Sequence, residues 1–232
     1  MFFKMRIRKK KWVDDELENC EFLIKDPINQ KGKWKDVFIK EQPIYLELGC
    51  GKGGFASKFG VKNLDKNLIA VDMVPAMLGA AKRKIEKEYL EHNQEINNIC
   101  IVSQNIERIS EIFGEDDKGK YDKIERIYIN FCNPWPRGKH KKRRLTHTRQ
   151  LEQYKKFLIP NGEIYFKTDD DELFEESLEY FNGCGYEILE ITRDLHNYDG
   201  DILKENIVTE HEKMFSDEGI KIKFLRARLK NL

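Results

Sequence analysis

Short apolar runs alternate with longer amphipathic runs along most of the chain. The apolar runs are rich in β-branched and aromatic residues, which favour strands. They predict strands at residues 44–48, 67–72, 99–103, 127–131, 162–168, 186–192 and 220–229. The runs between them predict helices from about residue 55, at 75–90 and 148–158, from 169 to about 181, and from about 208. This alternation predicts an α/β fold with a doubly wound sheet, in which a ligand binds at the carboxyl ends of the strands.

Polar side chains stand at the ends of five successive predicted strands. They are Glu47, Asp72, Asn105, Asn133 and Asp169. The carboxyl ends of parallel strands lie at one edge of a sheet, so these five residues predict a shared site there.

A glycine-rich loop follows the first of these strands and reads GCGKGG over residues 49–54. Glycines between a strand and a helix let a ligand approach the backbone, and both dinucleotide enzymes and S-adenosylmethionine enzymes use them. Glu47 favours the second class, because a carboxylate would repel a pyrophosphate but attract an ammonium and a sulfonium. Lys52 argues weakly for the first class, and a strand-end carboxylate that faces water is the structural alternative for Glu47.

The next two strands offer further ligand contacts. Asp72 lies about as far beyond the glycine loop as the acid that binds a ribose in such folds. Asn105, with Glu107 nearby, could accept a hydrogen bond from an adenine amine, and an Asx turn explains Asn105 equally well.

The fourth strand runs into Asn133-Pro134-Trp135-Pro136, a stiff extended loop because each proline fixes its own φ and restricts the residue before it. A dense group of cations follows at Arg137, Lys139, His140, Lys141, Lys142, Arg143 and Arg144. A basic run alone is typical of a solvated surface. An amide, an aromatic ring and these cations at one strand end together favour a nucleic-acid site. For Trp135 we expect packing more than base stacking, since tryptophan is mostly buried.

Two later segments carry candidate site residues with structural alternatives. Asp170 and Asp171 are best explained as helix caps, which leaves Asp169 as the site candidate. Thr209-Glu210-His211-Glu212 has the form of a capping box, and that role could explain it entirely.

Composition limits the class of protein further. The 232 residues carry a net charge of +1 and 40% apolar residues, which suits one sizeable core. The basic run is offset by acidic segments elsewhere, so the near-neutral total does not exclude a polyanion partner. Five scattered cysteines lack disulfide or zinc spacing, so we expect a reduced cytoplasmic protein without a metal. No apolar run is long enough to cross a membrane.

The N-terminus is basic but carries no secretion signal. Residues 4–11, KMRIRKKK, fit a disordered tail better than an arm that docks on RNA. We divide the chain into a basic extension at 1–40 and one catalytic domain at 41–232.

With these motifs in hand, the chain resembles the bacterial tRNA (guanine-N7)-methyltransferases over nearly its whole length. The shared segments are MRIRKKKW from Met5, the Glu47 glycine loop, NPWP with its basic run, FKTD, DLHN and TEHE. The most specific is the Pro-Trp-Pro loop followed by H-x-K-R-R-L. The family pattern begins near Met5, so residues 1–4 fit an upstream start.

The resemblance implies a seven-stranded S-adenosylmethionine-dependent fold with an antiparallel C-terminal strand. It implies transfer of a methyl group from S-adenosylmethionine to N7 of a guanine in the tRNA variable loop. It assigns the cofactor to Glu47, Gly49, Gly51, Asp72, Asn105 and Asn133, with Asn133 also at the catalytic position. It assigns the substrate to Arg137, Asp169, Thr209, Glu210, His211 and Glu212, and we expect phosphate contacts at Lys139, His140, Lys141, Lys142, Arg143 and Arg144. The oligomeric state is open between monomer and homodimer.

The chain departs from the family pattern at several positions. The family usually has Asp at position 133 and commonly at 105, many relatives have Glu at position 72, and Arg137-Gly138-Lys139 replaces a run of Lys and Arg. Guanine N7 carries a lone pair and no proton, so methyl transfer needs placement and charge stabilisation but no general base. We therefore interpret Asn133 as an orienting group in an active enzyme.

Three alternatives remain from the residues. An enzyme that methylates an exocyclic amine is the nearest, because Asn-Pro followed by an aromatic residue is similar to the N-P-P-Y loop of that class. A tRNA-binding protein without transfer activity is the second, and a nicotinamide dehydrogenase is the last.

Overall fold

The predicted strands pair into one sheet in the computed structural model, which describes residues 11–230. Its strands are β1 (Leu23–Ile24), β2 (Ile44–Leu48), β3 (Asn67–Asp72), β4 (Ile99–Ser103), β5 (Ile124–Asn130), β6 (Leu158–Thr168), β7 (Tyr186–Thr192) and β8 (Lys223–Leu229). The order is β1-β4-β3-β2-β5-β6-β8-β7, and β8 runs antiparallel to both of its neighbours while the other pairs are parallel. All seven expected strands are present, and the two-residue β1 adds an eighth at one edge.

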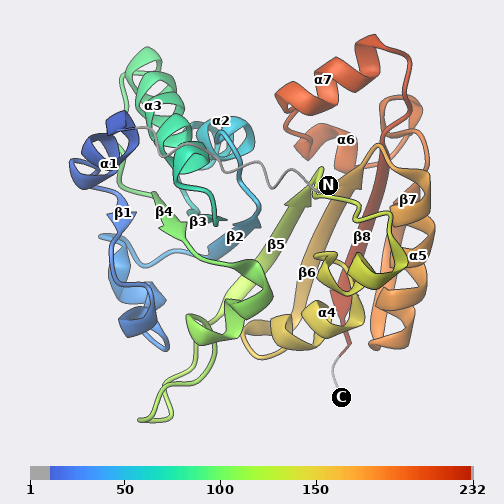
Figure 1. The fold of residues 1–232 in the computed structure, drawn as a ribbon, viewed down its shortest axis with the longest axis horizontal. Helices are drawn as coiled ribbons and strands as arrows, with labels where there is room; N and C mark the ends of the chain where they lie inside the picture. Colours follow the sequence, from blue (N-terminus) through green and yellow to red (C-terminus); the bar gives the residue numbers. More distant parts are fainter. Residues whose placement is uncertain (1–10, 231–232) are drawn as a thin grey trace, which may run out of the picture.

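Helices cover both faces of this sheet, as a doubly wound fold requires (Figure 1). They are α1 (Lys11–Glu18), α2 (Gly54–Lys62), α3 (Pro75–Glu91), α4 (Thr148–Tyr154), α5 (Asp171–Gly183), α6 (Ile202–Glu205) and α7 (Glu210–Asp217). Short 3-10 helices lie at Ile28–Gln30, Trp34–Val37, Ile106–Glu111, Gly138–Arg143 and Leu195–Asn197.

Alternation along the strands divides the buried residues into two cores. Leu46 of β2 and Ile127 of β5 join the core under α4 and α5. Tyr45 and Tyr128, one residue away on the same strands, join the core under α2, α3 and α6. Successive strand residues point to opposite faces, so the polar residues in phase with Tyr45 and Tyr128 face α2.

Several element boundaries differ from the prediction. Helix α4 ends at Tyr154, not 158, because β6 already begins at Leu158 and continues through Pro160-Asn161-Gly162. Asn161 accommodates this with a φ of 62°. The closing strand starts at Lys223, not 220, because α7 ends at Asp217 and Gly219 turns the chain with a φ of 76°.

Residues 11–40 pack against the rest of the chain. Val13 of α1 is buried where this helix packs on α3. Trp34 is fully buried, donates a hydrogen bond from Nε1 to the Ile112 carbonyl at 2.6 Å, and stacks on Phe113. The suggested upstream start at residues 1–4 and nearly all of the basic arm at 4–11 lie outside the described residues.

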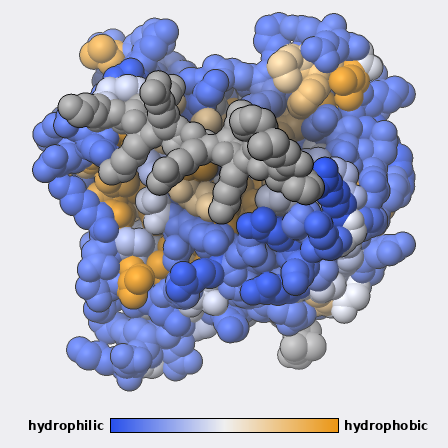
Figure 2. All heavy atoms as spheres, in the orientation of Figure 1, coloured by the Kyte–Doolittle hydropathy of each residue, from blue (hydrophilic) through white to orange (hydrophobic). Residues whose placement is uncertain are grey.

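The visible surface is mostly hydrophilic (Figure 2). Exposed apolar side chains include Val208, Met214 and Ile220, in and beside α7. Between residues 11 and 230, no helix has the length and apolar character needed to cross a membrane. All five cysteines are free thiols, and four of them are buried.

Candidate functional site

The glycine loop is folded tightly against the end of β3. The N–H groups of Gly49 and Cys50 both donate to the Val71 carbonyl, at 2.9 and 3.0 Å. Gly49, Gly51 and Gly53 have φ values of 83°, 53° and 75°, a left-handed conformation that favours glycine. A side chain at Gly53 would lie 2.8 Å from Ala81 Cβ, so this glycine lets α2 pack on α3, whereas space at Gly51 is open.

Asp72 braces this loop from the end of β3. Its Oδ2 accepts a hydrogen bond from the Gly51 N–H at 3.0 Å, and its Oδ1 accepts one from the Val74 N–H at 2.8 Å. The carboxylate thus connects the glycine loop to the start of α3. It is half-buried and keeps acceptor capacity for a ligand.

Glu47 lies buried at the end of β2 with only 2% of its surface exposed. Its Oε2 has no hydrogen-bond partner within residues 11–230. Burial raises the pKa of Glu47 to about 8, a rise that the Asn130 amide and the Lys167 ammonium oppose and the Asp72 charge reinforces. The alternative of a strand-end carboxylate facing water is therefore wrong, and the residue presents an unused acceptor.

A cavity of about 180 Å³ joins this carboxylate to the loop and to the C-terminal part of the chain. Its lining includes Glu47, Gly49, Gly51, Phe55, Asn130, Phe131, Thr209, Glu210 and His211. Six of the predicted site residues, from the end of β2, the glycine loop and the start of α7, therefore meet around one cavity, which Asn130 also lines.

Sequence reasoning missed Asn130 and Phe131. Asn130 Nδ2 is buried and has no hydrogen-bond partner in the described chain. Phe131 has a φ of 53°, an unfavourable conformation for a residue with a Cβ, and such conformations cluster at functional sites. Their position at the end of the predicted strand 127–131, just before Asn133, was the available signal.

The Thr209–Glu212 segment forms the N-cap half of the expected capping box, while the Glu212 carboxylate accepts from Lys167 and Asn206. Thr209 Oγ1 accepts a hydrogen bond from the Glu212 N–H at 3.1 Å and caps α7. Glu212 is fully buried and forms an ion pair with Lys167 at 2.7 Å. Glu210 and His211 are exposed beside the cavity, with Glu210 paired to Lys84 and the His211 ring 6.3 Å from that of Phe131.

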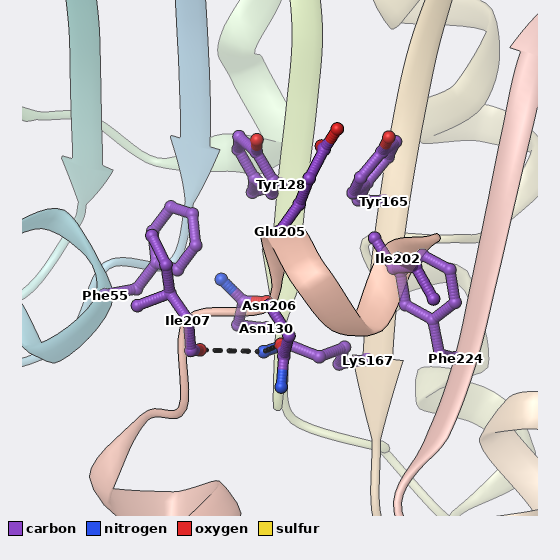
Figure 3. Close-up of a pocket in the computed structure, with 10 residues that line it drawn as sticks. All are labelled: Phe55, Tyr128, Asn130, Tyr165, Lys167, Ile202, Glu205, Asn206, Ile207 and Phe224. Atoms are coloured by element: carbon purple, nitrogen blue, oxygen red, sulfur yellow. Dashed lines mark hydrogen bonds between the residues drawn. The ribbon is translucent and has the colours of Figure 1, made fainter. Parts of the chain in front are cut away.

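A smaller cavity lies next to the first one and shares Phe55 and Asn130 with it (Figure 3). Lys167 and Asn206 also line it, and Figure 3 shows them together with Asn130 at the ends of β5 and β6. Lys167 Nζ donates to Asn206 Oδ1 at 2.9 Å and to the Ile207 carbonyl at 3.1 Å.

Asn133 lies in the exposed loop beyond β5 and outside the lining of the 180 Å³ cavity. Its Oδ1 accepts a hydrogen bond from the Trp135 N–H at 3.0 Å. Trp135 is half-buried, and the Arg143 guanidinium lies 4.5 Å from its ring centre. This cation–π contact and the internal hydrogen bond fix the shape of the loop.

The predicted phosphate contacts divide into exposed and engaged cations. Lys139 and Lys142 are exposed, as is Arg137. Lys141 is paired with Glu172 and Glu176, and Arg143 is paired with Glu107 at 2.8 Å. His140 lies beside Trp135, with the ring centres 5.8 Å apart.

Arg144 is a correction to the predicted phosphate contacts. It is 0% exposed. Its guanidinium donates to the Pro134 carbonyl at 2.6 Å and to Glu176 at 2.7 Å, so it anchors the loop to α5. Because the Arg144 guanidinium is buried, it is not accessible to a phosphate.

The remaining predicted residues lie at neighbouring strand ends. Asn105 Oδ1 accepts from the Glu107 N–H at 3.0 Å, so the Asx turn is present. Asp170 caps α5 by accepting from the Leu173 N–H at 2.6 Å. Asp169 is half-buried beside that cap, and its carbonyl accepts a hydrogen bond from Lys223 Nζ at 2.8 Å. Neither Asn105 nor Asp169 lines the 180 Å³ cavity.

Comparison with known proteins places this geometry among methyltransferases. A family model described as "Putative methyltransferase" matches residues 41–225. The chain is 59% identical to the tRNA (guanine-N(7)-)-methyltransferase of Clostridium beijerinckii, covering 98% of this chain and 100% of the relative. It is 50% identical to the enzyme of the same name from Acetivibrio thermocellus, covering 97% and 100%.

Solved structures support the fold at low sequence identity. The 16S rRNA methyltransferase KamB matches with a TM-score of 0.56 at 10% identity, over 82% of this chain and 89% of that one. An antibiotic-related methyltransferase matches with a TM-score of 0.54 at 15% identity, over 88% and 90%.

Proposed function

The chain belongs to the tRNA (guanine-N(7)-)-methyltransferase family, and from this premise we propose that it transfers a methyl group from S-adenosylmethionine to N7 of a guanine in tRNA. We place that guanine in the variable loop. The observation that carries the proposal within the chain is the buried Glu47 carboxylate, whose Oε2 has no hydrogen-bond partner in the described residues and which lines a cavity between the glycine loop and Thr209–His211.

The residues around the cavity fit S-adenosylmethionine. The buried Glu47 Oε2, to which no group of the described chain donates within hydrogen-bond distance, suits the ammonium group of that cofactor, and the Asn130 amide lies beside it in the same lining. The left-handed glycines, with open space at Gly51, allow a ligand to lie against the backbone. Asp72 would hold the ribose and Asn105 the adenine.

When bound, the cofactor supplies an electrophilic methyl group. Because guanine N7 carries a lone pair and no proton, the chain would need no general base, and its residues would serve to align the two reactants. The N7–CH3 bond would form as the S–CH3 bond breaks, and the buried Glu47 carboxylate would hold the cationic end of the cofactor near this edge of the sheet.

Asn133 would orient the guanine. Its Oδ1 already accepts from Trp135, so the free end of the amide is a donor, which matches an acceptor such as guanine O6. An aspartate in the same position would present an acceptor there and a full negative charge. We therefore assign Asn133 an orienting role that does not depend on proton transfer, with Asp169, Thr209, Glu210 and His211 as further candidate contacts to the substrate. Glu212 is not among them, because it is fully buried and paired with Lys167.

The exposed cations next to Asn133 would bind the tRNA backbone. The exposed side chains are those of Arg137, Lys139 and Lys142, which follow the loop that the contact between Trp135 and Arg143 stiffens. Phosphate contacts of this kind position a nucleic acid without reading its sequence. We place the reaction in the cytoplasm, where five free thiols stay reduced.

The test is methyl transfer from labelled S-adenosylmethionine to a tRNA transcript without modifications, followed by digestion to nucleosides and identification by mass. We expect 7-methylguanosine. A methylated exocyclic amine would instead assign the chain to amine methylation, and tRNA binding without any methylated product would identify a binding protein. Heat-denatured chain is the matched control for uncatalysed methylation.

A further inference from the structure

Three lysines from three different elements hold the segment 206–212, which forms one side of the cavity. Lys58 of α2 donates to the Val208 carbonyl at 2.8 Å. Lys84 of α3 pairs with Glu210, and Lys167 of β6 pairs with Glu212. The segment is therefore attached both to the helices beside the glycine loop and to the sheet.

The attachment through Lys167 differs from the other two because it is buried. Lys167 is 5% exposed and Glu212 is 0% exposed, whereas Glu210 and Val208 are exposed. Lys167 Nζ has three partners in the segment, which are Asn206 Oδ1, the Ile207 carbonyl and Glu212 Oε2 (Figure 3 shows the bond to Ile207). The Asn206 amide in turn donates to Glu212 Oε1 at 2.7 Å, so the network is closed.

The sheet register places Lys167 on the same face of the sheet as Glu47. Asn130 pairs with Lys167, and Glu47 pairs with Tyr128, two residues before Asn130. Paired residues on adjacent strands point to the same face, and residues two apart on one strand do so too. Glu47, Asn130 and Lys167 therefore lie on the same face of β2, β5 and β6, with Asn130 and Lys167 two residues beyond the pair of Glu47. The charge of Lys167 also contributes to the pKa of Glu47.

We propose that Lys167 is a positioning residue for the methyl transfer, which holds residues 206–212 as the outer wall of the cofactor cavity. Through this wall, Thr209, Glu210 and His211 are kept against the ligand that the glycine loop binds. The inference rests on the proposed function for the identity of the ligand. Glu212 then acts through Lys167 and Asn206, and does not touch the substrate.

A purely stabilising ion pair is the competing explanation, and the variants are chosen to separate the two. Lys167→Met leaves the Glu212 charge buried and unpaired, which destabilises the fold itself. Lys167→Met/Glu212→Gln removes both charges, so it should fold with near wild-type stability while lacking the connection from β6 to residues 206 and 207. Lys82→Met is the matched control, because Lys82 is also buried and paired with Glu86 at 2.6 Å, but against α1 and outside the cavity lining.

The readouts are melting temperature, the Kd for S-adenosylmethionine by calorimetry, and KM against kcat for methyl transfer. We expect the double variant to melt near the wild-type temperature, to bind S-adenosylmethionine at least tenfold more weakly and to raise KM for it, with kcat at saturation changed less than threefold. We expect Lys82→Met to bind within twofold of wild type. Hydrogen exchange of the double variant should be faster at residues 206–212.

Two results would overturn the role of Lys167. A folded double variant that binds S-adenosylmethionine within twofold of wild type would show that the wall does not need the lysine. A loss of affinity in Lys82→Met equal to that in the double variant would show that any buried lysine pair has the same effect. If wild-type chain itself binds no S-adenosylmethionine, the proposed function fails first, and the role of Lys167 fails with it.

Discussion

The buried Glu47 carboxylate makes S-adenosylmethionine binding dependent on pH. Its pKa is raised to about 8 by burial, so at pH 7 about nine-tenths of the ligand-free molecules carry the proton. A ligand cation placed against this group favours the ionised form and therefore expels the proton. Ionisation of Glu47 at pH 7 costs about 1.4 kcal/mol, which corresponds to roughly tenfold weaker binding than at a pH where it is already ionised.

The expected pH profile follows from these values. Between pH 6.0 and 7.5 the Kd of wild-type chain should fall about 20-fold, because the cost of removing the proton falls with rising pH. Binding at pH 7 should release about 0.9 proton, which calorimetry measures by comparing buffers of different ionisation enthalpy. The pH is kept at or below 7.5 because an α-amino group, such as that of the ligand, titrates at about 7.7–8.0.

Glu47→Gln is the matched variant, since the amide has the same shape and no proton to release. It should bind at least tenfold more weakly, and its Kd should be flat over the same pH range. The variant should fold: the stability contributed by neutral Glu47 is present below pH 4.5 and is lost as the pH rises toward 8, so the amide should be at least as stable above pH 7. A wild-type Kd that does not change with pH, or a variant that binds like wild type, would refute the reasoning.

Three further predictions concern the loop beyond β5. Asn133→Ala should lower kcat at least tenfold with little change in the Kd for tRNA, and full activity would show that the amide does not orient the guanine. Neutralising Arg137, Lys139 and Lys142 together, each to Gln, should reduce the slope of log Kd for tRNA against log salt concentration by about 2, measured by filter binding; an unchanged slope would place the phosphate contacts elsewhere. Arg144→Met should lower the free energy of unfolding by about 1.5–3 kcal/mol in urea titrations, because it removes the charged hydrogen bonds from the buried guanidinium to Glu176 and to the Pro134 carbonyl while Lys141 still pairs with Glu176, and a loss below about 1 kcal/mol, as at exposed pairs, would contradict the anchoring role.

The strands, Glu47 and the glycine loop could be predicted from the local sequence. The predicted ranges 44–48, 67–72 and 99–103 coincide with β2, β3 and β4, because buried parallel strands are short, apolar and bounded by glycine or polar residues. The range 186–192 likewise coincides with β7, which pairs antiparallel with β8. Glu47 and the glycine loop were identifiable for the same reason, since their role depends on residues within a few positions of each other.

The parts of the site that involve Lys167 and Arg144 depend on contacts between segments far apart in the sequence. Nothing in the local pattern around Lys167 indicates that it meets Glu212, 45 residues later, because that pairing results from the packing of α7 over the end of β6. Arg144 is similar, since it looks like its neighbours in the basic run until Glu172 and Glu176 of α5 close around it. Charge runs and capping motifs show which residues are polar, but tertiary packing decides which of them stay accessible.

The position of the methyl group on tRNA tests the central claim most directly. A transcript methylated by the wild-type chain is cleaved by chemistry specific for 7-methylguanosine, and the cleavage site is read at single-nucleotide resolution beside a transcript whose variable-loop guanine is replaced by adenine. We expect one cleavage site, at the variable-loop guanine, and none in the replaced transcript. Methyl groups on another atom, at another position, or equally in the replaced transcript would contradict the account.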